Sequence, residues 1–189
     1  MKPKPHFDYP VHELIQKRWS PRAYSAQPVE EDTILTLFEA ARWAASGGNE
    51  QPWRFIYATH QQTERFGKLA ECLSENNRVW APEAPALILT LVKTLNSRNN
   101  QPNRYAWHDL GLAVGNLTTQ ASALDLYVHQ MAGFSAEKAK HLFDLPPDIE
   151  PVTMIAVGYL GDPEQLPDNL KERELAQRQR KTLDELIIK

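Results

Sequence analysis

Two arginines and a serine hydroxyl fall within five residues near the start of the chain, in the segment Arg18-Trp19-Ser20-Pro21-Arg22. Guanidinium groups bind phosphate oxygens in bidentate fashion, and a serine hydroxyl supplies one more donor. The segment follows a short predicted helix over residues 12–19 and is stopped by a proline. It therefore suits a phosphate-binding turn, but these residues alone favour a solvent-exposed basic turn.

A second polar segment, Ser46-Gly47-Gly48-Asn49-Glu50-Gln51, ends a predicted helix and leads into a strand. The side-chain amides of Asn49 and Gln51 carry donors and acceptors, which suits the edge of a planar heterocycle. A glycine- and asparagine-rich helix end with no ligand is the alternative. A third segment, Met131-Ala132-Gly133, leaves a strand and enters a helix, so its backbone N–H groups are able to face a ligand.

Other catalytic patterns are missing from the sequence. The six histidines show no i, i+4 pairing typical of a metal site, and the single cysteine, Cys72, excludes an intrachain disulfide or a cysteine-based zinc cluster. No Gly-x-Ser-x-Gly elbow, phosphate-binding P-loop or Gly-x-Gly-x-x-Gly fingerprint occurs. These absences argue against a metal centre, a hydrolase and a Rossmann domain, and Cys72 is expected to be inert packing.

The elements that must position these segments alternate along the chain. Hydrophobic periodicity predicts helices over about 12–19, 28–45, 61–73, 104–124 and 135–144, and strands over 54–58, 84–93, 126–129 and 152–160. The strand over 84–93 is almost entirely apolar, which indicates burial on both faces. The pattern predicts a three-layer α+β or α/β sandwich. Gly111 and Gly115 weaken the longest helix, which suggests that another surface approaches it closely.

Length and charge limit the remaining possibilities. The 189 residues predict one domain, and a net charge of −3 argues against a generic nucleic-acid binder. No apolar run approaches the roughly 20 residues that a membrane helix needs. Residues 1–10 carry three prolines and lack the apolar stretch of a secretory signal, so we expect an N-terminal arm and a cytoplasmic protein. Nine of the fifteen residues over 171–185 are charged, and this tail is expected to fray or to lie on another surface.

Three motifs together resemble the FMN-dependent nitroreductase family. They are the Arg18-x-Ser20-x-Arg22-x-Tyr24 opening, the Ser46-x-x-Asn49-x-Gln51-Pro52-Trp53 turn and the basic segment at the end of the chain. The resemblance runs from about Val11 to Ile188. It implies an α+β fold with a central, mainly antiparallel sheet between helices, in an intertwined homodimer with FMN at the subunit interface. Residues 11–167 would form the FMN-binding domain, and residues 168–189 an arm that packs on the partner subunit.

The resemblance also carries over site residues. The backbone of Trp19 would lie near the flavin ring, while basic and hydroxyl side chains would hold the FMN phosphate and ribityl chain: Arg18, Ser20, Arg22, Arg178 and Arg180.

Other family positions would meet the flavin ring or the ribityl chain. Asn49 and Gln51 would come from the partner subunit, and Asn77 is a further candidate contact. The backbone of Met131, Ala132 and Gly133 would face flavin N5 and O4.

The implied activity is transfer of hydride from NADH or NADPH, through flavin N5, to a nitroaromatic or quinone-like acceptor in a ping-pong scheme. No side chain is assigned as a catalytic acid or base, because the cofactor carries the chemistry. Tyr105, Trp107 and His108 are candidates for the substrate pocket, with packing in the core or against a partner as the alternative. Reductive dehalogenation, flavin fragmentation and a non-enzymatic flavin carrier or sensor remain alternative functions.

Overall fold

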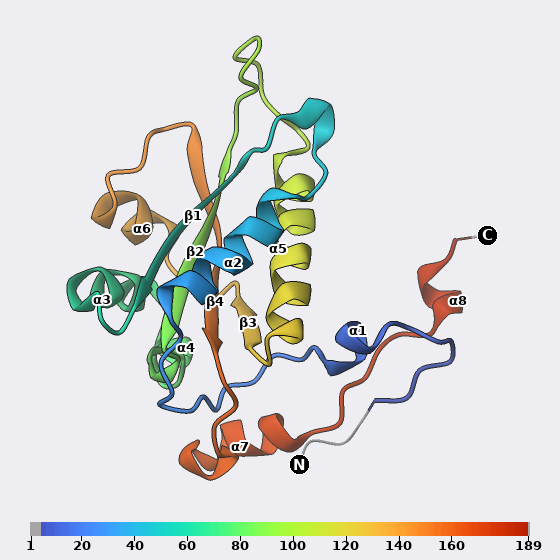
Figure 1. The fold of residues 1–189 in the computed structure, drawn as a ribbon. Coiled ribbons are helices and arrows are strands. Elements are labelled where there is room, and N and C mark those ends of the chain that lie inside the picture. Colours follow the sequence, from blue (N-terminus) through green and yellow to red (C-terminus); the bar gives the residue numbers. More distant parts are fainter. Residues whose placement is uncertain (1–4, 189) are drawn as a thin grey trace.

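A four-stranded antiparallel sheet forms the centre of the computed structural model, which describes residues 5–188 (Figure 1). Its strands are β1 (Trp53–Thr59), β2 (Ala86–Lys93), β3 (Tyr127–Met131) and β4 (Ile149–Gly158), in the order β1-β2-β4-β3. Every neighbouring pair is antiparallel. The predicted α+β class with an antiparallel sheet is confirmed, and an α/β arrangement with parallel strands is excluded.

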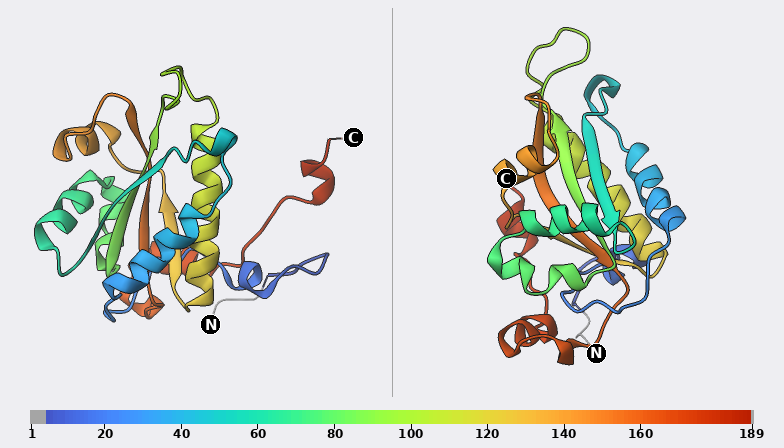
Figure 2. Two further views of the ribbon diagram at one scale, coloured as in Figure 1. Left: turned by 45° about the horizontal axis from the view of Figure 1, so that its top comes forward. Right: turned by 90° about the vertical axis from the view of Figure 1, so that its left-hand side faces the viewer.

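Helices cover both faces of this sheet and complete the predicted three layers. On one face lie α2 (Glu31–Arg42) and α5 (Ala106–Ala123), with α1 (Glu13–Lys17) against α5. On the other face lie α3 (Thr63–Cys72), the short α4 (Glu75–Arg78) and α6 (Ala136–Leu142), as Figure 2 shows. Short 3-10 turns occur at Gly47–Asn49, Ala81–Glu83 and Pro163–Gln165.

The strand β2 separates two apolar clusters, because successive side chains of a strand point to opposite faces. Leu87, Leu89 and Leu91 belong to the cluster under α3 and α6, whereas Ile88 and Val92 belong to the cluster under α2 and α5. All five are buried. The expected burial of this strand on both faces is therefore confirmed, and the α5 helix is anchored by its apolar stripe.

The C-terminal segment differs most from the sequence expectation. Residues Asp168–Leu175 form a helix, α7, in which Leu170 and Glu174 are buried against the rest of the same chain. Residues after 175 then run away from the body and end in the short helix α8 (Leu183–Leu186), as Figures 1 and 2 show. The expected arm thus divides into a docked helix and an extended segment. Part of the expected N-terminal arm, residues 1–4, lies outside the described residues.

The glycines of α5 have no close neighbour in this chain. A Cβ built at Gly111 or Gly115 would meet nothing within 4 Å among the described residues. We expected these glycines to let another surface pack closely against α5. The body of the same subunit does not supply that surface. A membrane span is not found either, since none of the helices over residues 5–188 combines the necessary length with the necessary apolar character.

Candidate functional site

The basic segment 18–22 crosses from α1 to the end of the sheet, where it is tied to the strand that leaves β4. The backbone N–H of Gly161 donates to the carbonyl of Ala23 over 3.0 Å, and that of Ser25 donates to the carbonyl of Tyr159 over 3.0 Å. A side chain at Gly161 would collide with the backbone carbonyl of Tyr24. This close approach fixes the position of the segment that carries the predicted phosphate-binding residues.

Three guanidinium groups gather beside this segment. Arg178 donates to the backbone carbonyls of Arg18 and Gln16, the latter over 3.0 Å, and so brings the C-terminal arm against residues 16–18. Arg18 in turn lies 3.3 Å from the hydroxyl of Ser20. Burial lowers the pKa of Arg18, and the positive charges of Arg178 and Arg180 lower it further. The structure therefore brings four of the predicted phosphate-binding residues together.

No acidic side chain among residues 5–188 neutralises this arginine cluster. Over residues 5–188, no ion pair is formed by Arg18, Arg178 or Arg180. The Nε of Arg178 is also the one buried side-chain nitrogen or oxygen of the described chain that lacks a hydrogen-bond partner. A buried donor without an acceptor is costly, and like charges repel. An anion with several oxygens would satisfy both requirements.

Arg22 has a different environment from the other arginines. Its backbone N–H donates to Oε2 of Glu174 over 2.9 Å, and its guanidinium lies 4.0 Å from the same oxygen. The guanidinium also stands 5.9 Å from the centre of the Trp80 ring, within range of a cation–π contact. Burial lowers the pKa of Arg22, while the Glu174 carboxylate opposes that shift. Arg22 is thus held by a buried acid, whereas Arg18 is not.

The loop after β3 is clamped by residues of the α3–α4 region. The carbonyl oxygen of Gly133 accepts two hydrogen bonds, from the backbone N–H of Ser74 over 3.0 Å and from the side-chain amide of Asn77 over 2.9 Å. A Cβ at Gly133 would stand 2.7 Å from the Asn77 amide nitrogen, too close for ordinary contact. Asn77 therefore positions the predicted loop in this structure, and Gly133 is required for the fit.

One hydrogen bond links the strand leading to this loop with the basic segment. The Nδ1 of His129, in β3, lies 2.7 Å from the carbonyl oxygen of Pro21. Because a carbonyl only accepts, Nδ1 carries the proton. The ring of Trp80 packs on His129 with centroids 4.5 Å apart. The basic segment and the strand that ends at Met131 therefore form one connected unit.

Asn49 and Gln51 lie elsewhere, in a strained exposed turn. Both have left-handed backbone angles, with φ of 58° and 49°, and their side-chain amides bond each other over 3.2 Å. Asp109, near the start of α5, anchors this turn by accepting the backbone N–H of Gly47 over 3.0 Å. Such backbone strain persists only where surrounding contacts impose it, and it clusters at functional sites.

The two predicted groups sit at opposite ends of α5. The turn with Asn49 and Gln51 is fixed to Asp109, whereas Lys17, next to the basic segment, pairs with Asp125 just past the helix end. At 1.5 Å per residue, these ends are about 20 Å apart. The turn of one chain therefore does not reach the arginine cluster of the same chain.

The candidate pocket residues Tyr105, Trp107 and His108 are exposed at the start of α5. Tyr105 is 54% and Trp107 48% exposed, so packing in the core of this chain is excluded for both. His108 lies 3.2 Å from the buried carboxylate of Asp109. Tyr105 lies beside Gly47 of the turn with Asn49 and Gln51, and His108 contacts the Asp109 that anchors that turn.

Three supporting residues carry no recognisable signal in the sequence. In the sequence, Trp80 is an ordinary apolar residue and Asp109 is one acidic residue in a helix of mixed composition. Glu174 is one of many charged residues in the tail. Trp80 and Asp109 are each 2% exposed in the structure, and Glu174 is 1% exposed. No local pattern marks them, because their roles depend on contacts with residues far away in the sequence.

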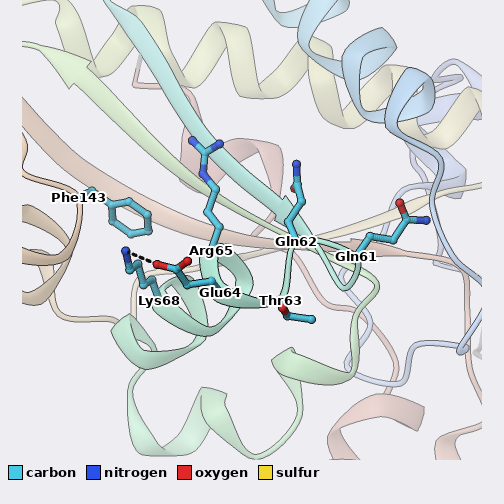
Figure 3. Close-up of a pocket in the computed structure, with 7 residues that line it drawn as sticks. All are labelled: Gln61, Gln62, Thr63, Glu64, Arg65, Lys68 and Phe143. Carbon is cyan, nitrogen blue, oxygen red and sulfur yellow. Dashed lines mark ion pairs between the residues drawn. The ribbon is translucent and has the colours of Figure 1, made fainter.

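A cavity of about 580 Å³ lies at the start of α3, on the face of the sheet that α3 and α6 cover (Figure 3). It is lined by residues 61–65, Lys68 and Phe143, and the ammonium of Lys68 pairs with Glu64 at 3.0 Å. None of the predicted site residues lines it. It plays no part in the site described above.

Comparison with known proteins bears on the family and the fold. The family model described as the nitroreductase family matches residues 15–83 and 69–159. A solved structure of an oxidoreductase containing FMN is 34% identical and superimposes with a TM-score of 0.86, covering 92% of this chain and 89% of its own. An Archaeoglobus fulgidus protein provisionally named NADH dehydrogenase/NAD(P)H nitroreductase is 26% identical, covering 79% of this chain and 84% of its own.

Family relatives do not all share one named reaction. An iodotyrosine deiodinase of Thermotoga neapolitana is 27% identical, covering 81% of this chain and 90% of its own. Membership of the family is nevertheless settled by the match over residues 15–159, which is more than half of the chain, and the antiparallel fold is consistent with it. This chain belongs to the nitroreductase family.

Proposed function

We propose that the chain binds FMN and transfers hydride from NADH or NADPH, through flavin N5, to a nitroaromatic or quinone-like acceptor. One observation carries this proposal: Arg18, Arg178 and Arg180 form a cluster without a counter-ion among the described residues, in which a buried donor of Arg178 lacks an acceptor. The terminal phosphate of FMN offers a dianion with several acceptor oxygens. The FMN named for a 34% identical structure supports the same cofactor.

The residues present fit FMN at three points. Arg18, Arg178 and Arg180, with the Ser20 hydroxyl, would hold the phosphate. Arg22 would add a positive charge beside the ribityl chain or the ring, where it favours the reduced and more negative flavin. The backbone at 131–133, fixed by Asn77, would supply N–H donors to the ring. When bound, FMN supplies the redox chemistry, and the chain binds and orients it.

A homodimer would complete each site. The turn with Asn49 and Gln51 lies about 20 Å from the arginine cluster of its own chain, as the length of α5 requires. A second copy would bring its own turn to that cluster. The arm also leaves Leu186 and Ile187 exposed, at 61% and 55%, and Ile188 at 99%. Such side chains on a charged arm favour burial against a partner. We expect an interface above the roughly 2,000 Å² of obligate pairs.

The test combines spectroscopy with one substitution. Purified protein is expected to show flavin absorption, to release FMN and not FAD on denaturation, and to bleach on addition of NADH or NADPH. Arg18→Ala is expected to weaken FMN binding by about 1.5–3 kcal/mol, or ten- to hundredfold, because it removes a charge-assisted contact to phosphate. Fluorescence titration of the apoprotein with FMN measures this change.

Arg65→Ala serves as the matched control. It removes the same charge from the start of α3, on the other face of the sheet. FMN affinity is expected to stay at the wild-type value in this variant. A colourless protein that binds no added FMN would refute the proposal. Protein that binds FMN but oxidises NADH and NADPH no faster than unbound flavin does would instead be a flavin carrier.

Reductive dehalogenation is the second candidate, favoured by the 27% identical deiodinase. It would use the same FMN site with a halogenated aromatic acceptor. Release of halide from a halotyrosine, measured beside reduction of a nitroaromatic with the same reductant, separates the two reactions. We place the nitroaromatic or quinone-like acceptor first because the Archaeoglobus fulgidus relative bears the name NADH dehydrogenase/NAD(P)H nitroreductase.

A further inference from the structure

Glu174 is the most deeply buried carboxylate associated with the site. Its side chain is 1% exposed, in the last turn of α7, and it contacts both the backbone and the side chain of Arg22. Burial of a carboxylate is costly unless hydrogen bonds and a positive charge compensate it. The contacts with Arg22 supply both, and they join the C-terminal helix to the basic segment.

Three contacts hold the segment around Arg22, whose side chain is 24% exposed. Glu174 accepts its backbone N–H, the ring of Trp80 lies against its guanidinium, and the preceding carbonyl, of Pro21, accepts from His129. These contacts leave the guanidinium few alternative positions. Glu174 is the only member of the set that bears a charge opposite to that of Arg22.

We propose that Glu174 is a positioning residue for Arg22, and that its negative charge lowers the reduction potential of the bound flavin. The inference rests on the proposed function, because it concerns the environment of FMN. Arg22 favours the reduced flavin through its positive charge, and a carboxylate that partly neutralises Arg22 weakens that preference. Glu174 therefore opposes the positive charge of the arginine cluster and keeps reduced FMN able to donate electrons.

Two substitutions separate the position of Arg22 from the charge beside it. Glu174→Gln keeps an oxygen that accepts the Arg22 backbone N–H but removes the negative charge. Glu174→Ala removes both. Glu172→Gln is the matched control, since it makes the same charge change on an exposed position of the same helix.

The midpoint potential of FMN bound to each protein is the decisive measurement. In Glu174→Gln, the ratio of FMN dissociation constants for the oxidised and reduced states is expected to shift about tenfold toward the reduced state. That is about 30 mV upward for a two-electron couple. Glu172→Gln is expected to stay at the wild-type potential. A Glu174→Gln potential equal to that of Glu172→Gln would overturn the electrostatic role, because the buried charge would then have no greater effect on the flavin than an exposed one.

Amide hydrogen exchange in the apoprotein tests the positioning role without flavin. Exchange at Arg22 is expected to accelerate at least tenfold in Glu174→Ala and to stay close to wild type in Glu174→Gln. Equal exchange in wild type and Glu174→Ala would overturn the positioning role. If wild-type protein binds no FMN, the proposed function fails and the potential has no meaning, whereas the exchange result still decides whether Glu174 holds Arg22.

Discussion

Replacement of the two glycines of α5 by alanine gives a direct test of where a second subunit packs. Gly111 and Gly115 are exposed and lie one turn apart, and a methyl group at either would meet nothing within 4 Å among the described residues of the same chain. Each glycine in a helix interior costs about 0.8–1.0 kcal/mol relative to alanine. In an isolated chain, Gly111→Ala with Gly115→Ala is therefore expected to raise stability by about 2 kcal/mol. For a domain of this size, that corresponds to a melting temperature about 4–8 °C higher.

A dimer that packs on this strip predicts the opposite sign. Added methyl groups at a tight interface cost about 1–3 kcal/mol, which weakens dimerisation about ten- to hundredfold. Sedimentation over a range of protein concentrations measures the dimer dissociation constant, and calorimetry gives the melting temperature. Gly67→Ala is the control, because Gly67 is also an exposed helical glycine with no neighbour within 4 Å, but it lies in α3 on the opposite face.

The result that would refute this reasoning is specific. If the double variant is stabilised by about twice as much as Gly67→Ala and its dimer dissociation constant is unchanged, the strip on α5 is not an interface. The fold would then give no reason for the presence of two glycines in this helix. If dimerisation weakens while Gly67→Ala leaves it unchanged, a second subunit supplies the close approach that one chain does not.

Two further predictions concern the segment beside the site and the single thiol. Gly161→Ala is expected to destabilise the protein by about 1–3 kcal/mol, because the added Cβ would collide with the Tyr24 carbonyl. Denaturant unfolding measures this change, and stability equal to wild type would contradict the close approach of these two backbones. Burial raises the pKa of the Cys72 thiol. The native protein is therefore expected to react slowly with a disulfide reagent at pH 8, and the unfolded protein at the ordinary rate of a free thiol. Rapid labelling of the native protein would contradict this prediction.

Much of the fold was predictable because its elements carry their own patterns. The all-apolar strand over residues 86–93 and the stripe of α5 each indicate burial without any knowledge of their neighbours. The helix α7 was missed for the same physical reason. It buries only Leu170 and Glu174, so its sequence lacks an apolar stripe, and the helix is held by one leucine and one charged contact with Arg22.

The candidate site was predictable in part. Arg18 and Ser20 are close neighbours in the sequence, and a motif alone is enough to identify such residues. Pairing of Arg22 with Glu174 spans 152 residues, and only the folded chain shows it. Asn77 was expected to contact the flavin, and in this structure its amide holds the Gly133 carbonyl. The residue type indicated a side chain that makes hydrogen bonds, whereas the direction of that side chain depended on the loop that packs against it.

The arrangement of charges explains why the C-terminal segment has two parts. The helix α7 brings Glu174 to Arg22 and packs Leu170 in the core, so it belongs to the body of its own chain. The arm that follows brings Arg178 to the backbone of Arg18, and neither arginine has an acid paired with it among residues 5–188. In the proposed FMN complex, α7 would offset the positive charge of Arg22 on the flavin side of the basic segment, and the arm would add positive charge on the phosphate side. The proposal thus assigns the two requirements, tight binding of a dianion and a flavin that can donate electrons, to different residues of the same tail.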